Sequence, residues 1–266
     1  MSNEKSLSKS YALPNMPDNY YETARNCSCL NNVGSQMAKD WVSAKKPEEG
    51  EFNWTPSDNC PSTNALFSRF NFENVKLIWS NFEYGFKKNK VTEPFGFIVS
   101  DESLDYLVFR GTLFDQGKDS PDFIADLDAN LIPYKDANNV EVGKVSEGFY
   151  RVFNGLELEL KQHLKTIEGN NRPLVITGHS LGSTLATLSF ALISDASSSF
   201  NFDVHNYPQA SPKVGNADFV SWYQNLEGNT YRLVNTEDKV PKQPPFKAYQ
   251  HVGDLVSYNA PYGGDE

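Results

Sequence analysis

The sequence predicts an α/β fold in which a mostly parallel central sheet is covered by helices on both faces. Short apolar runs of strand length alternate with segments of helical periodicity, an order typical of parallel sheets. The composition suits one such core, because 39% hydrophobic and 22% charged side chains in 266 residues are ordinary for a globular domain. We therefore expect a single domain over residues 1–266, with a poorly ordered polar leader at about 1–15.

The first readable elements form a strand pair. Phe95–Ser100 and Leu104–Phe109 are apolar runs, and the polar residues Asp101 and Glu102 between them supply a turn. This pattern predicts a hairpin. The first 65 residues give no comparably clear pattern.

A long amphipathic helix is predicted next, from Gly148 to about Gly169. Its apolar residues recur every three or four positions: Phe149, Phe153, Leu156, Leu160, Leu164 and Ile167. The continuous apolar run Leu174–Thr177 then reads as a buried strand, and the small apolar stretch Thr184–Ile193 as the following helix. The local order is strand, sharp turn, helix.

The remaining third of the chain continues the alternation. We expect a strand at Asp203–Pro208, a helix around Asp218–Leu226, a strand at Tyr231–Asn235, a proline-rich loop at Thr236–Pro245 and a final segment at Tyr249–Tyr258. In such sheets functional residues gather at the carboxyl ends of the strands.

Charge and hydropathy restrict the partners. The formal charge of -10 opposes binding to nucleic acid or anionic lipid, so a neutral lipid or ester substrate fits better, with at most a transient contact with a lipid interface. No apolar run approaches the roughly 20 residues of a membrane-spanning helix. The first 26 residues lack the apolar stretch of a secretory signal, so we expect a cytoplasmic protein or export without a Sec signal.

The three cysteines, Cys27, Cys29 and Cys60, predict no metal site, because no nearby histidine completes a zinc-like set. We interpret them as structural thiols. One bridge from Cys60 to Cys27 or Cys29 is the alternative.

The pentapeptide Gly178–Gly182, GHSLG, matches the pattern GxSxG. This pattern alone is weak evidence, since chance produces it in roughly one protein of this length in ten. Its position between a predicted strand and a predicted helix is what makes it specific, because this is where the nucleophile elbow of the α/β-hydrolase fold carries its serine. The turn is so tight that a Cβ at Gly178 or Gly182 would clash. Ser180 is therefore the predicted nucleophile.

Elimination among four histidines identifies the base, since in this fold the acid and the histidine follow the serine in the chain. His163 precedes Ser180 in a helix, His179 projects elsewhere from the elbow, and His205 lies inside a predicted strand. His251 remains. Because an unperturbed imidazole titrates near about 6.5, we expect activity to climb between about pH 6 and 8.

Two neighbouring carboxylates compete for the role of the acid. Asp238 follows the strand Tyr231–Asn235 and lies in the loop where a strand end would present it. Glu237 is the rival, and one residue of slip would turn the side chain in another direction. We favour Asp238.

Four segments together resemble the class 3 lipases of the fungal triacylglycerol lipase type. In the family's order they are VFRGT at 108–112, ITGHSLGS at 176–183, SPKVGN at 211–216, and VNTEDKVP with YQHVG at 234–241 and 249–253. The resemblance implies an α/β-hydrolase fold with a short lid helix, and it covers the chain from about Phe95 to Tyr258.

The resemblance also implies roles for individual residues. It selects Asp238, because the family's acid stands two residues before its VP pair, and it assigns the oxyanion hole to Thr112 and the backbone N–H of Leu181. Arg110 reads as structural, since ester hydrolysis requires no guanidinium. Ser183 departs from the family, in which Gly or Ala is usual at this position.

The predicted activity is hydrolysis of carboxylic esters, most of all acylglycerols, through an acyl-enzyme on Ser180. It needs no metal or organic cofactor. The alternatives on the same scaffold are a phospholipase, a galactolipase and a feruloyl-type esterase, which differ in the substrate pocket. A catalytically silent binding module is the alternative from another class, and a broken triad or blocked elbow would mark it.

The family's lid corresponds to residues Leu113–Leu127. Ser120 is a suitable N-cap and Pro121 a suitable first helical residue, so we expect a short helix at about Pro121–Leu127. Opening this lid would expose little apolar surface, because no large apolar residue but four charged ones lie between Phe114 and Phe123: Asp115, Lys118, Asp119 and Asp122. Only slight activation by emulsions is expected.

Overall fold

A seven-stranded sheet forms the centre of the protein in a computed structural model that describes residues 19–56, 69–84, 89–112, 130–195 and 198–259. Its strands are β1 (Lys76–Tyr84), β2 (Asn89–Ser100), β3 (Asp105–Phe109), β6 (Leu174–His179), β7 (Val204–Gln209), β8 (Asn229–Asn235) and β9 (Asp254–Tyr258). The spatial order is β1-β2-β3-β6-β7-β8-β9. From β3 to β9 the neighbours are parallel, whereas β1 and β2 are antiparallel. The sheet is thus mostly parallel, as predicted.

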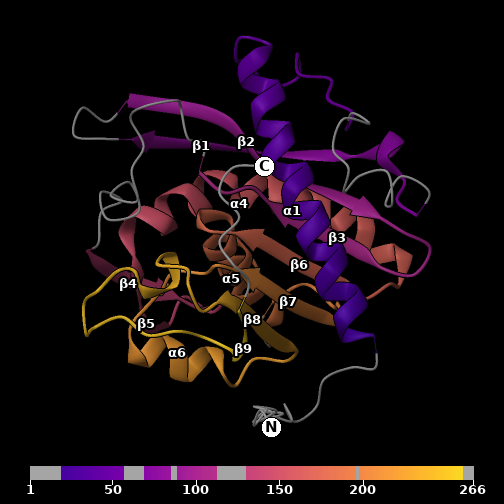
Figure 1. The fold of residues 1–266 in the computed structure, drawn as a ribbon. Coiled ribbons are helices and arrows are strands. Elements are labelled where there is room, and N and C mark those ends of the chain that lie inside the picture. The colour runs from indigo at the N-terminus through magenta and orange to yellow at the C-terminus, as the bar shows by residue number, and fades with distance from the viewer. Residues whose placement is uncertain (1–18, 57–68, 85–88, 113–129, 196–197, 260–266) are drawn as a thin grey trace, which may run out of the picture.

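Helices cover both faces of this sheet (Figure 1). The helix α1 (Tyr20–Ser43) runs across one face and contacts β2, β3, β6 and β7. The other face carries α4 (Glu147–Ile167), α5 (Leu181–Ser194) and α6 (Ala217–Tyr223). A separate hairpin pairs β4 (Leu131–Lys135) with β5 (Glu141–Ser146), and three 3₁₀ turns lie at Phe72–Asn74, Glu168–Asn170 and Val240–Lys242.

Each face of the sheet has its own core, because side chains alternate between the two faces along a strand. On β3, Leu107 and Phe109 belong to the core under α4 and α5, whereas Tyr106 and Val108 belong to the core under α1. The first core is largely aliphatic and phenylalanine-rich. The second also holds polar links, since Asn31 of α1 donates to Thr177 Oγ1 of β6 at 3.2 Å.

The predicted elements are present with shifted ends. The hairpin forms from β2 and β3, the long helix is α4, and the strand and helix around GHSLG are β6 and α5. The later strands and helix are β7, α6, β8 and β9.

Four elements were not predicted: α1, β1, β4 and β5. The buried apolar residues of α1 recur at helical spacing, so the sequence carried this signal and it was missed: Tyr20, Ala24, Cys27, Leu30, Met37 and Trp41.

Several predictions fall outside the described residues: the leader at 1–15, the lid helix at 121–127 and any bridge that involves Cys60. Cys27 is fully buried and forms no disulfide. Within the described ranges, no helix is long and apolar enough to cross a membrane.

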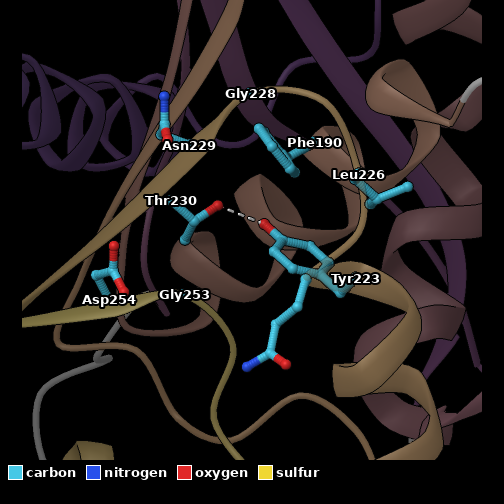
Figure 2. A pocket seen from close by; sticks show the side chains of 9 residues that line it. Phe190, Tyr223, Leu226, Gly228, Asn229, Thr230, Gly253 and Asp254 are labelled. Carbon is cyan, nitrogen blue, oxygen red and sulfur yellow. Dashed lines mark hydrogen bonds between the residues drawn. The ribbon is translucent and has the colours of Figure 1, made fainter. Parts of the chain in front are cut away.

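A small pocket of about 150 Å³ lies at the amino ends of β8 and β9 (Figure 2). Phe190 and Leu226 form its apolar wall, and Tyr223 bonds to Thr230 across it at 2.8 Å. Because β6, β8 and β9 all run in the same direction, this pocket and the residues after β6 lie at opposite ends of the sheet.

Candidate active site

Ser180 sits on a strained turn between β6 and α5. Its φ of 53° and ψ of -120° fall in a region that non-glycine residues rarely adopt. The flanking glycines make this turn possible: a Cβ on Gly178 would collide with the carbonyl of Gly182, and one on Gly182 with the carbonyls of Phe109 and Arg110. The predicted steric reason for both glycines is confirmed. The backbone N–H of Ser180 donates to Gln209 O at 3.0 Å, which ties the turn to the end of β7.

The loop after β3 lies against this turn. Phe109 pairs with Gly178 in the parallel register, so the residues that follow both strands emerge side by side. A Cβ placed on Gly111 would be 3.6 Å from Ser180 Cβ and 3.5 Å from His179 Nδ1, which shows how closely the loop approaches. Thr112 follows, and its Oγ1 is buried and has no hydrogen-bond partner among the residues that the structure describes. A buried hydroxyl in this state has a donor free for a ligand.

The two candidate acids differ in burial. Asp238 is 7% exposed, whereas Glu237 is exposed to solvent. The Asp238 carboxylate accepts a hydrogen bond from Val240 N at 2.8 Å, and its backbone N–H donates to Asn235 O at 3.0 Å, so a tight turn holds it. Asp238 is therefore buried and fixed by its own turn, whereas the Glu237 side chain faces solvent.

His251 lies half-buried beside the same loop. Its Nε2 donates to the carbonyl of Pro241 at 2.8 Å, and its Nδ1 is buried with no partner in the described part of the chain. No hydrogen bond joins Ser180, Asp238 and His251 among the described residues. The structure brings the predicted base to the loop of the predicted acid but leaves the chain of hydrogen bonds open.

In its present orientation the His251 ring directs Nε2 at the Pro241 carbonyl. A half-turn about Cβ–Cγ would exchange Nδ1 with Cδ2 and Nε2 with Cε1 while the ring plane stays in place. A carbon would then face the Pro241 carbonyl, as a weak C–H···O contact, and Nε2 would be released.

Electrostatics keep His251 neutral. Burial and the positive charges of Arg232 and Lys213 together lower its pKa to about 4, against the hydrogen bond to Pro241, which raises it. This environment therefore lowers the pKa of His251 below the value of an unperturbed imidazole. Burial also lowers the pKa of Arg232 itself, to about 10.

The sequence did not predict a place in the site for His179. Its ring lies beside the Gly111 loop, and packing of this kind lowers its pKa by desolvation while the charge of Asp238 raises it. The interaction with Asp238 shows that the acid loop lies near the elbow. The other two histidines lie elsewhere. His163 Nε2 bonds to Leu77 O on β1. His205 lies in β7, as predicted, and faces Asp203, which precedes the strand.

No cluster of three or more metal-ligating side chains occurs in the part of the chain that the structure describes. The fold and this site define an α/β-hydrolase with a nucleophile elbow. More narrowly, the chain belongs to the class 3 lipase family, described as "Lipase (class 3)", whose model matches residues 106–248.

Individual relatives agree with this family. The chain is 28% identical over 190 residues to "Secreted mono- and diacylglycerol lipase A" of Penicillium cyclopium, a match that covers 70% of this chain and 58% of that protein. It is 31% identical over 103 residues to "Phospholipase A1-Igamma3, chloroplastic" of Arabidopsis thaliana, covering 34% and 20%. The solved Lip2 lipase of Yarrowia lipolytica superposes with a TM-score of 0.63 at 22% identity, covering 92% of this chain and 81% of that one.

Proposed function

We propose that this chain hydrolyses carboxylic esters through an acyl-enzyme on Ser180, with acylglycerols as its substrates. The observation that carries this proposal is the strained elbow at Ser180 with the Gly111–Thr112 loop packed against it. Strain of this kind persists where the surrounding structure enforces it, and it places the hydroxyl at the carboxyl end of the sheet.

In the proposed mechanism, Ser180 Oγ attacks the ester carbonyl while His251 accepts its proton, and Asp238 orients the imidazole. The backbone N–H groups of Thr112 and Leu181, with the free Thr112 hydroxyl, stabilise the oxyanion. His251 then protonates the leaving alcohol, and water hydrolyses the acyl-enzyme. These steps require the His251 ring to take the turned orientation that frees Nε2 from Pro241.

The acylglycerol substrate class rests on the family and on the name of the Penicillium relative. A phospholipase is the second candidate, favoured by the Arabidopsis relative. The net charge of -10 favours neutral or zwitterionic lipids over anionic ones.

A panel of substrates tests the proposal: nitrophenyl esters of increasing chain length, tributyrin, monoacylglycerol and phosphatidylcholine, each with wild type and with Ser180→Ala as the matched blank. We expect hydrolysis of the nitrophenyl and acylglycerol esters that Ser180→Ala lacks. Hydrolysis of phosphatidylcholine alone would move the substrate class to phospholipids. No Ser180-dependent hydrolysis of any ester would refute the proposal.

For location we propose export, because the Penicillium relative is secreted by name. Recovery of the native protein from the culture medium, rather than from the cells, would support export.

A further inference from the structure

In each of the two peptide groups of the proposed oxyanion hole, the carbonyl oxygen opposite the N–H donor accepts a hydrogen bond from a buried side chain. Thr112 N–H belongs to the same peptide group as the Gly111 carbonyl, and Leu181 N–H to the same group as the Ser180 carbonyl. In a planar trans peptide the C=O and the N–H point in opposite directions. A contact that fixes either carbonyl therefore fixes the direction of the corresponding N–H.

Arg110 fixes the first carbonyl. Its Nη1 donates to Gly111 O at 2.9 Å, while Nε donates to Pro94 O at 2.8 Å and Nη2 pairs with Glu93 at 2.5 Å. The guanidinium also stacks 4.0 Å from the centre of the Phe95 ring. Arg110 is only 2% exposed, so three groups of β2 hold the planar fork in one orientation.

Ser183 fixes the second carbonyl. Its hydroxyl and its backbone N–H both donate to Ser180 O, the latter at 3.0 Å. A serine in a helix often bonds to a carbonyl three residues back, and Thr184 bonds to Leu181 O in the same way. What distinguishes Ser183 is the carbonyl that it holds, which belongs to the strained nucleophile. Ser183 is fully buried and stands where the family usually has Gly or Ala.

We propose that Arg110 and Ser183 are positioning residues that aim the two oxyanion donors of this site through the carbonyls of Gly111 and Ser180. The inference rests on the proposed function. It gives a role to a buried arginine that the chemistry itself does not use, and it predicts that both residues act on the transition state rather than on substrate binding.

The test compares Arg110→Lys and Ser183→Ala with two controls, Arg172→Lys at the other end of the sheet and Ser189→Ala, a buried serine later in α5. The first readout is kcat and KM on a nitrophenyl ester. The second compares inhibition by two compounds: a trifluoromethyl ketone, which forms an oxyanion when the serine adds to it, and the matching alcohol, which forms none.

Removal of a whole oxyanion donor costs about 10² to 10³ in kcat, so misdirecting one should cost less, roughly 10-fold for Ser183→Ala and 10- to 100-fold for Arg110→Lys. We expect KM and inhibition by the alcohol to stay within about twofold, ketone inhibition to weaken in step with kcat, and both controls to match wild type.

Unchanged kcat in the two variants, or equal weakening of ketone and alcohol, would overturn the inference. If Arg110→Lys does not fold, Ser183→Ala decides by the same criteria. Ser180→Ala distinguishes the proposed function from the positioning role. If Ser180→Ala is active, the proposed function is wrong. If Ser180→Ala is inactive while Ser183→Ala and Arg110→Lys are fully active, only the positioning role is wrong.

Discussion

The carboxyl end and the amino end of the parallel sheet hold two different kinds of polar residue. At the carboxyl end, Ser180 has a strained backbone, and Thr112 Oγ1 and His251 Nδ1 have no hydrogen-bond partner among the described residues. At the amino end, the fully buried Asp105 accepts hydrogen bonds from Ser100 Oγ at 2.5 Å and from Asn170 Nδ2 at 3.3 Å. Backbone strain destabilises a fold, and it persists where function uses it. Substitutions at the carboxyl end should therefore change activity, and those at the amino end stability.

The largest effect is expected for Ser180→Ala, which removes the nucleophile. Turnover should fall by roughly six orders of magnitude, as for other triad nucleophiles, while the urea midpoint stays at or above that of wild type because strain at Ser180 is not increased. Ester hydrolysis and urea unfolding measure the two quantities. A variant with a tenth of wild-type activity would refute the assignment of Ser180.

The next largest effect is expected for Asp238→Asn. Loss of the carboxylate leaves the imidazole in the wrong tautomer and should lower kcat by about 10⁴. Glu237→Gln is the matched control, since the neighbouring side chain is exposed, and it should retain full activity. If Glu237→Gln proves the more damaging change, the acid has been misassigned.

The pH profile gives a smaller effect at the same end of the sheet. Burial and the charges of Arg232 and Lys213 lower the pKa of His251, and the turned ring loses the bond to Pro241 that opposes them, so kcat/KM should rise with pH well below 6.5 and be flat between about pH 6 and 8. The same shift sets how the free energy of unfolding depends on pH. Because His251 has a higher pKa in the unfolded chain than in the folded one, the unfolded chain binds a proton at a higher pH, and stability should fall as pH drops from about 6.5 to 4. A rise centred at pH 6.5 or above would mean that the charge of Asp238 outweighs burial.

The smallest effect, and the opposite pattern, is expected at the amino end. Asp105→Asn weakens the bonds to Ser100 and Asn170, so it should lower the free energy of unfolding by about 1–3 kcal/mol and leave kcat unchanged. Urea unfolding beside an ester assay measures both. Asp254→Asn, which is exposed at the same end, is the control and should alter neither. A loss of kcat in Asp105→Asn without a loss of stability would contradict the division between the two ends.

The two ends also differ in how far the sequence predicts them. The strand, turn and helix around Ser180 are local, since Leu174–Thr177 and Thr184–Ile193 carry the pattern and the glycines have a steric reason that the sequence alone supplies. The class of fold and the candidate nucleophile were therefore predictable.

Other features depend on contacts between distant residues, and no local pattern announces them. The link from Asn31 of α1 to Thr177 of β6 joins residues that are 146 positions apart. The lowered pKa of His251 arises from burial and from Arg232 and Lys213, and the hold of Arg110 on Gly111 depends on Glu93. Such contacts become visible only once the chain is folded.

The central claim is that the strained elbow makes Ser180 a nucleophile, and covalent labelling tests it most directly. Wild-type protein is incubated with a fluorophosphonate, which reacts with activated serines, and the site and stoichiometry of the adduct are measured by mass spectrometry together with residual ester hydrolysis. We predict one adduct per chain, on Ser180, with activity lost in proportion to labelling and no adduct in Ser180→Ala. An active enzyme that remains unlabelled at Ser180, or an adduct on another residue that accounts for the lost activity, would contradict it.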